Sequence, residues 1–270
     1  MGKGSWAVLR QDKELMLLPV IGLAVMIVVA LVLLIPLITV FTALETTNEF
    51  TGASELSGGG SALAFVLILA GYYLLTLINQ VFAGGVVHGA YTRMTGGDPT
   101  VMSSIKAAGS KTKQLIPWAI ATGTVGLLLD ALRDKGFIGK IIAGFISFAW
   151  KTATFLVLPI LVIEGLGPRD AYNRSRQLMS GRWGESASAT FGFILIGFVA
   201  SLPALFLIFI GGQLGGSGFI LIGLAFVWLA VTSVVINTLT GVMRAALYLY
   251  TVSGEVPADF QGVGLESAFG

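Results

Sequence analysis

Residues 15–44 read LMLLPVIGLAVMIVVALVLLIPLITVFTAL, a run of 30 residues without a single charged side chain. About 20 consecutive apolar residues are enough for a helix to cross the hydrocarbon core of a bilayer. Five further predominantly apolar runs follow along the chain, and none shows the alternation of period two that a membrane β-barrel requires. The predicted spans are therefore six helices, at residues 15–44, 63–91, 114–132, 138–163, 187–212 and 219–243.

The composition of the whole chain points to the same class of protein. Of 270 residues, 55% are apolar and 11% are charged, whereas a soluble domain carries about 25% charged residues; the mean hydropathy is +0.89. The net charge of +2 does not indicate binding to nucleic acid. The absence of Cys excludes disulfides and thiolate metal sites. We predict an all-α, polytopic membrane helical bundle with no metal site and no cofactor.

The distribution of Lys and Arg predicts the orientation in the membrane, because cytoplasmic loops carry an excess of both. With the N-terminus in the cytoplasm, twelve of the sixteen basic residues fall on the inner side and three on the outer side, and Lys151 falls within a span. Both termini are then cytoplasmic. The segments predicted to be cytoplasmic are 1–14, 97–113, 167–184 and 252–270.

The cytoplasmic segments look like short amphipathic helices that each precede a pair of spans. In the second of them, Asp98 suits an N-cap and Pro99 the first helical position. SWAVLRQDKELMLLP before the first span and SIKAAGSKTKQLIP before the third are weakly similar. This pattern suggests three hairpin repeats around a central axis. The alternative is a chance similarity, because any short polar segment that leads into an apolar span looks much the same.

Lys151 is the first candidate for a functional residue, because it lies near the middle of the fourth span. At ~1.5 Å per residue it is about 16 Å from Lys140 and about 20 Å from Glu164 along a helix, so neither interface is within easy reach. A charge at this depth is costly and marks a candidate functional site. Four arrangements would make Lys151 tolerable at this depth: a neutral amine, a water-filled cavity, a bound anionic ligand, or an acid on another chain. The alternative is a structural lysine that only hydrogen-bonds to nearby polar groups. The polar residues expected at similar depth are Asn79, Gln80, Thr152, Thr232, Ser233 and Asn237.

Two further charged groups lie at the inner side of the predicted bundle. Arg169, Arg174, Arg176 and Arg182 fit a helix lying on an anionic leaflet, each base worth roughly 1 kcal/mol. Ordinary positive-inside topology without a specific lipid is the favoured explanation of these arginines. Glu164 ends the fourth span, where the helix dipole disfavours an acid. It should therefore have a cationic partner. Arg244 and Arg169 are the nearest candidates by depth, and we predict a structural pair of Glu164 with Arg244.

Three prolines and one histidine complete the unusual residues of the spans. Pro36, Pro159 and Pro203 are expected to kink their helices, with the freed carbonyls satisfied inside the bundle. His88 is interpreted as a hydrogen-bonded packing residue, because the sequence places no acid at its depth for a proton relay.

The chain shows none of the sequence motifs of catalysis. It has no Walker loop, HExxH, GxSxG or kinase signature, and apart from Asp130 near the end of the third span the helix interiors carry no acid. We therefore expect a protein that is not an enzyme. The first hypothesis is a structural or accessory subunit that packs against another membrane protein or a second copy of itself; the alternative is a transporter or channel for a small anionic solute or lipid that uses Lys151, Asn79, Gln80 and Asn237. A cavity that reaches Lys151 separates the two.

Four stretches carry a resemblance to a known family: SWAVLRQDKELMLLP (5–19), GDPTVMSSIKAAGSKTKQLIPWAIATGTVGLLLDAL (97–132), AWKTATFLVLPILVIEGLGPRDAYNRSRQLMSGRWGE (149–185) and ALYLYTVSGEVPADF (246–260). They resemble an uncharacterised family of prokaryotic six-span membrane proteins described as a domain of unknown function. More loosely, the layout resembles the membrane domain of some glycerophosphodiester phosphodiesterases. The resemblance implies a prokaryotic plasma membrane and supplies no catalytic residue. From the residues themselves, we expect membrane lipids, another membrane protein or a second copy of the chain as partners.

Overall fold

The computed structural model describes residues 2–43, 45–47, 54–56, 58–179, 183–254 and 256–261. Six helical segments are long and apolar enough to cross a membrane, which confirms the predicted number and the all-α class. The helices are α1 (Gly2–Gln11), α2 (Leu17–Ala43), α3 (Gly58–Met94), α4 (Val101–Gly109), α5 (Thr112–Arg133), α6 (Gly136–Ala153), α7 (Val157–Pro159), α8 (Pro168–Met179), α9 (Trp183–Gln213) and α10 (Phe219–Ser253), with short 3-10 turns at Lys13–Met16, Gly215–Gly218 and Ala258–Phe260.

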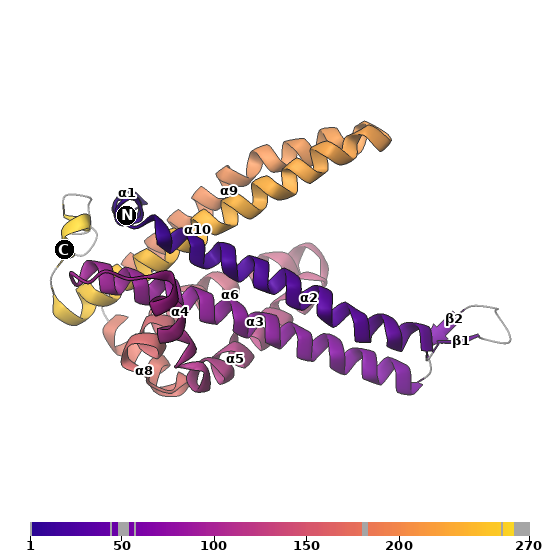
Figure 1. Cartoon of the computed structure of the whole chain (residues 1–270), viewed down its shortest axis with the longest axis horizontal. Coiled ribbons are helices and arrows are strands. Elements are labelled where there is room, and N and C mark those ends of the chain that lie inside the picture. The colour runs from indigo at the N-terminus through magenta and orange to yellow at the C-terminus, as the bar shows by residue number, and fades with distance from the viewer. Residues whose placement is uncertain are drawn as a thin grey trace.

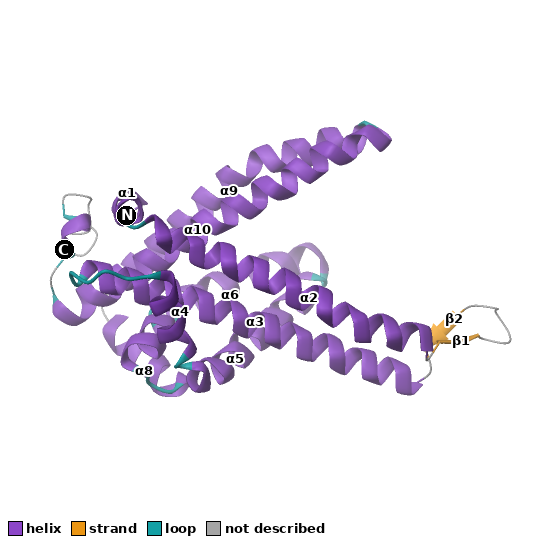
Figure 2. Ribbon diagram, in the orientation of Figure 1, coloured by secondary structure: helices purple, strands orange, loops and turns teal. Residues whose placement is uncertain are grey.

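Three helical hairpins, α2–α3, α5–α6 and α9–α10, diverge from a common base (Figure 1). A short helix precedes each hairpin: α1, α4 and α8, respectively. Almost all of the drawn secondary structure is helical (Figure 2); at the tip of the first hairpin, β1 (Glu45–Thr47) and β2 (Ser54–Leu56) form a small antiparallel ladder. The same order of elements therefore occurs three times along the chain.

The base holds most of the buried core, although the three hairpins are largely exposed. Residues 155–162 are all buried, as are Ala245, Ala246 and Leu247 of α10. Phe260 is fully buried against Gly4 of α1, so segments from the two ends of the described chain pack together there. Apolar side chains along α2 and α9 stay exposed, as expected for helices in contact with lipid.

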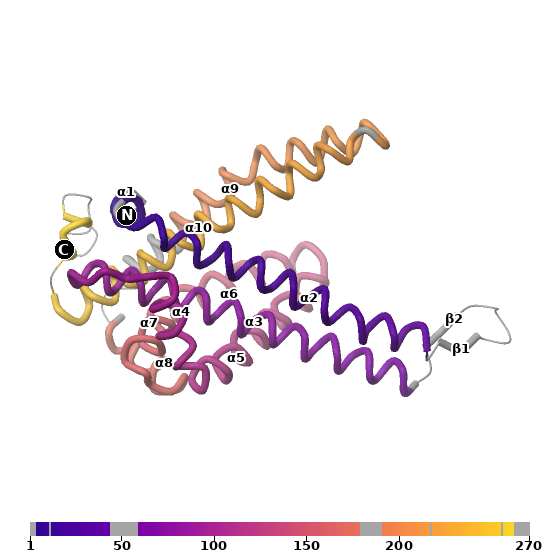
Figure 3. Tube along the Cα trace, in the orientation of Figure 1, coloured from indigo at the N-terminus to yellow at the C-terminus, as the bar shows by residue number. Residues whose placement is uncertain are grey.

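The fourth predicted span is not one continuous helix. α6 ends at Ala153, the chain turns through residues 154–156, and α7 continues into a single π-helical segment, Ile160–Glu164 (Figure 3). Pro159 has no amide hydrogen, so the carbonyl of Phe155 loses its α-helical donor. At the end of α6, the amide and the hydroxyl of Thr154 both donate to the carbonyl of Trp150, at 3.0 and 2.7 Å. Instead of the expected kink at Pro159, the helix is therefore interrupted at residues 154–156, about one turn before the proline.

The start of α4 differs from the predicted one. Asp98 is not the N-cap: the Thr100 hydroxyl accepts from the Ser103 amide and the Ser103 hydroxyl accepts from the Thr100 amide, which is a capping box. The helix consequently begins at Val101, and Pro99 precedes it. The Asp98 carboxylate pairs with Arg93 instead of capping the helix.

Candidate functional site

A cavity of about 580 Å³ lies among α2, α3, α5, α6, α7 and α10. Its wall contains all four residues that the sequence places near mid-membrane as candidates, namely Lys151, Asn79, Gln80 and Asn237. These residues come from three different helices, α3, α6 and α10. The structure therefore brings them to one place, while the role of each stays a prediction.

Lys151 reaches the cavity from the last turn of α6. The preceding residue, Trp150, stacks on Trp118 of α5 with 6.0 Å between ring centroids and 19° between the ring planes. This stack holds the end of α6 against α5. The Lys151 side chain is exposed, and within the described parts of the chain no carboxylate forms an ion pair with it.

Arg244 is a further cation of the cavity wall, in addition to Lys151 and Arg133. Its guanidinium carbon lies 5.4 Å from the centroid of the Phe155 ring, close enough for a cation–π contact. Its Nε is buried and has no hydrogen-bond partner among the residues that the structure places. A buried donor without a partner costs about 1–3 kcal/mol, so this nitrogen is poised for an acceptor.

The predicted pair of Glu164 with Arg244 is wrong. Glu164 Oε1 accepts a hydrogen bond from the Tyr248 hydroxyl at 2.9 Å, and Arg174 Nε lies 3.7 Å away. Arg244 and Tyr248 are one turn apart on α10, but only Tyr248 reaches Glu164, because Arg244 lies over Phe155. The acid has its cationic partner, and that partner comes from α8.

Replacing Glu164 with glutamine should lower the free energy of unfolding by about 1 kcal/mol, because the neutral amide keeps the Tyr248 contact and loses the attraction to Arg174. Thermal unfolding in detergent measures the change. Asp170→Asn is the matched control, since Asp170 is exposed and forms no ion pair among the described residues. Equal stability of Glu164→Gln and the wild type would contradict a stabilising role for this contact.

The remaining polar groups of the wall are mostly neutral donors and acceptors. Gln80 Nε2 donates to the Thr122 hydroxyl at 3.2 Å. Asp130 also lines the cavity, but Arg133 pairs with it three residues later and balances its charge. Lys151 and Arg244 therefore leave the cavity with an excess of positive charge. Among the described residues, no group of three or more His, Cys, Asp or Glu side chains that could hold a metal ion occurs.

The arginines of α8 take different positions. Arg169 and Arg176 are exposed, whereas Arg174 is engaged with Glu164, and Arg182 lies outside the described residues. The opposite face of the helix is buried through Ala171 and Ser175. Contact of Arg169 and Arg176 with anionic lipid stays a prediction.

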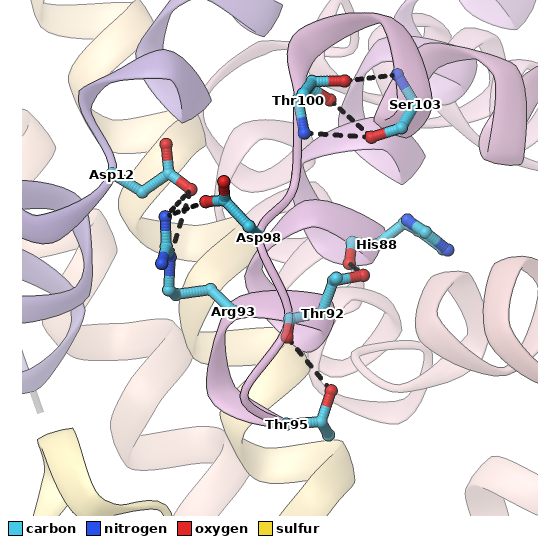
Figure 4. Close-up of polar contacts among 8 residues, drawn as sticks. All are labelled: Asp12, His88, Thr92, Arg93, Thr95, Asp98, Thr100 and Ser103. Carbon is cyan, nitrogen blue, oxygen red and sulfur yellow. Dashed lines mark hydrogen bonds and ion pairs between the residues drawn. The ribbon is translucent and has the colours of Figure 1, made fainter.

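A second polar cluster fixes the junction of α1, α3 and α4 (Figure 4). Arg93 donates to Asp12 from Nε at 3.3 Å and from Nη2 at 3.1 Å, and Nη2 also donates to Asp98 at 2.8 Å. His88, one turn earlier on α3, has a buried Nδ1 without a hydrogen-bond partner in the described chain, contrary to the expected satisfied histidine. This cluster is an anchor between segments.

Sequence reasoning missed Arg244, Phe155 and the Trp118–Trp150 stack as parts of the site. One signal for Arg244 was available: it is the single charged residue of the 35-residue helix α10, one turn after Thr240. The pairing of the two tryptophans depends on how α5 and α6 pack, which spacing in the sequence does not reveal.

These observations define a membrane-type protein with six candidate spans and a cavity that Lys151, Arg244 and residues of all three hairpins line. The chain belongs to DUF6159, a family of unknown function, whose profile matches residues 62–258. No curated protein and no solved structure matches the chain. The resemblance to an uncharacterised family is confirmed, while the looser similarity to the membrane domain of glycerophosphodiester phosphodiesterases finds no support.

Proposed function

We propose that the protein binds an anionic solute or lipid in its central cavity and moves it within or across the membrane. The observation that carries this proposal is the position of Lys151 and Arg244 in the wall of one cavity, where neither has a carboxylate partner among the residues that the structure describes. Cations within membrane-spanning segments are expensive unless paired. An anion from outside the chain supplies the missing partner.

The cavity also favours this function over the structural role that the sequence first suggests. A subunit whose only task is packing needs tight helix contacts and no polar cavity at its centre. Here the cavity reaches Lys151 and has a volume within the range of ~300–1,000 Å³ that is common for ligand sites. The broken helix beside Lys151 supports the same conclusion, since interrupted helices build the binding sites of many transporters.

Native mass spectrometry of the full chain, extracted gently from its own membrane, tests the proposal. We expect the wild-type protein to retain an anionic molecule. Lys151→Met should lower the retained fraction about tenfold or more, because one charge-assisted hydrogen bond is worth about 1.5–3 kcal/mol. Arg244→Met should act in the same direction, and Arg244→Lys, which keeps the charge, should restore part of the binding.

The matched control is Lys140→Met on the same helix, because Lys140 is exposed and outside the cavity wall. It should leave retention unchanged. Retention that is equal in the wild type, Lys151→Met and Lys140→Met would overturn the proposal, as would a wild-type chain that carries no anion.

A second candidate, an accessory subunit, is favoured by the α9–α10 hairpin, which projects away from the other hairpins (Figure 1). Its apolar residues Phe198, Phe206 and Phe226 are each about 60% exposed. A protein that co-purifies in equal amount and is lost when these residues are mutated would support this alternative. The absence of such a protein would remove it.

The orientation with both termini in the cytoplasm of a prokaryotic cell belongs to the same proposal. Support comes from the common location of α1 and the Ala258–Phe260 turn at the base (Figure 1) together with the basic residues of that end. Labelling of single cysteines in intact cells tests it: cysteines at Ser110 and Ser253 should be protected, and one at Asp134 should react.

A further inference from the structure

The cavity has two chemically different walls. The α2 residues that line it, Pro19, Gly22, Leu23 and Met26, are all apolar. On α10 four of the six lining residues are polar or charged; these are Ser233, Asn237, Thr240 and Arg244. The cavity is thus amphipathic, with hydrocarbon on one side and hydrogen-bonding groups on another.

The apolar wall continues beyond the cavity along the hairpins. Next to Met26 on α2, Val28 and Leu31 are each 59% exposed, and on α10 the residues Val227 and Val231 are 62% and 58% exposed. The two hairpins to which these residues belong diverge from the base (Figure 1), so exposed apolar faces continue from cavity-lining stretches of both α2 and α10. Of the charged residues of the cavity wall, Asp130 and Arg133 pair with each other at the end of α5, whereas Lys151 and Arg244 form no ion pair among the described residues.

The volume adds to this argument. A cavity of about 580 Å³ is far larger than a bare phosphate or carboxylate needs, and lies in the range that holds a drug-sized ligand. A small inorganic anion would leave the α2 wall facing water. An acyl chain would cover that wall and recover roughly 0.8 kcal/mol for each buried CH₂ group.

From this combination we infer that the ligand is an anionic lipid whose acidic headgroup binds Lys151 and Arg244 while its acyl chain lies against α2. The inference rests on the proposed function and adds the class of ligand. The headgroup chemistry alone fits a soluble phosphate ester equally well. The apolar wall and the exposed hairpin faces are what assign the ligand to the bilayer.

Binding of three probes to the full chain in an uncharged detergent separates these possibilities. The probes are dioleoyl phosphatidic acid, glycerol phosphate as its soluble headgroup, and dioleoyl phosphatidylcholine, which has the same chains without a net charge. We expect phosphatidic acid to bind at least tenfold more tightly than either of the other two. In Lys151→Met the preference over phosphatidylcholine should fall severalfold.

A substitution in the apolar wall tests the acyl chain separately. Leu23→Trp adds bulk at a cavity-lining position of α2, where the acyl chain is placed, and should weaken phosphatidic acid binding at least fivefold. Val199→Trp on α9 is the control, because Val199 is 55% exposed and outside the cavity wall. Thermal unfolding of both variants identifies any loss that comes from misfolding.

The outcomes distinguish the two levels of the proposal. Glycerol phosphate that binds as tightly as phosphatidic acid, with Lys151 dependence, would overturn the lipid inference and leave the anion-binding function standing. Equal binding of phosphatidic acid and phosphatidylcholine, unaffected by Lys151→Met, would overturn anion recognition itself. Binding of none of the probes would overturn the lipid inference, and the native mass measurement would then decide the function.

Discussion

Replacing Arg93 with methionine is expected to lower the free energy of unfolding by about 3 kcal/mol. The guanidinium is bonded to Asp12, whose side chain is only 4% exposed, and removing one partner of a buried ion pair costs about 3–5 kcal/mol. The lower end of this range applies because Arg93 itself is 28% exposed. Reversible unfolding in a detergent titration measures the change.

The second ion pair of Arg93 provides a control for this prediction. Arg93 also pairs with Asp98, whose side chain is 88% exposed, and an exposed ion pair is worth about 0–1 kcal/mol. Asp98→Asn should therefore cost less than about 1 kcal/mol, and Asp12→Ala considerably more. A loss from Asp98→Asn as large as that from Arg93→Met would contradict the assignment of the stability to the buried half of the cluster.

Leu161→Ala is expected to have a comparable effect, with a loss of about 2–4 kcal/mol. Leu161 is fully buried in the π-helical segment at the centre of the base, among the residues 155–162 that the structure buries completely. Truncation of a buried leucine leaves a void, and such substitutions cost about 2–5 kcal/mol in a close-packed core. Thermal unfolding of the purified chain is the direct measurement.

Leu128→Ala on α5 is the matched control, because the same atoms are removed from a side chain that is 65% exposed. Lipid or detergent contacts such a side chain in the folded protein and fills the space after truncation, so the expected loss is below about 0.5 kcal/mol. Equal effects of the two substitutions would mean that residues 155–162 are not the packed centre of the protein.

The spans could be predicted from the sequence because a bilayer imposes a length that can be counted directly. The span at residues 15–44 can be predicted from its own length and apolar composition, without knowing which helices pack against it. The polar residues at the depth of Lys151 could also be anticipated, since position along a span sets depth, and Asn79, Gln80 and Asn237 do line one cavity with Lys151.

Features that depend on helix rotation could not be predicted in this way. Arg244 and Tyr248 have similar depth on one helix, and only the packing of α10 against the broken fourth span decides which of them meets Glu164. Asp98 is a good cap by type, but Arg93 competes for its carboxylate. The break at residues 154–156 lies one turn before Pro159, so the position of the proline alone does not locate it.

The location of the core at the base has a consequence for the order of assembly during synthesis. The ion pair of Asp12 with Arg93 joins segments that leave the ribosome before the α5–α6 and α9–α10 hairpins, and domains generally form as the chain emerges from its N-terminal end. The buried residues of α10 and Phe260, by contrast, are translated after helices α1 to α9. One side of the base therefore stays uncovered until α10 has been made.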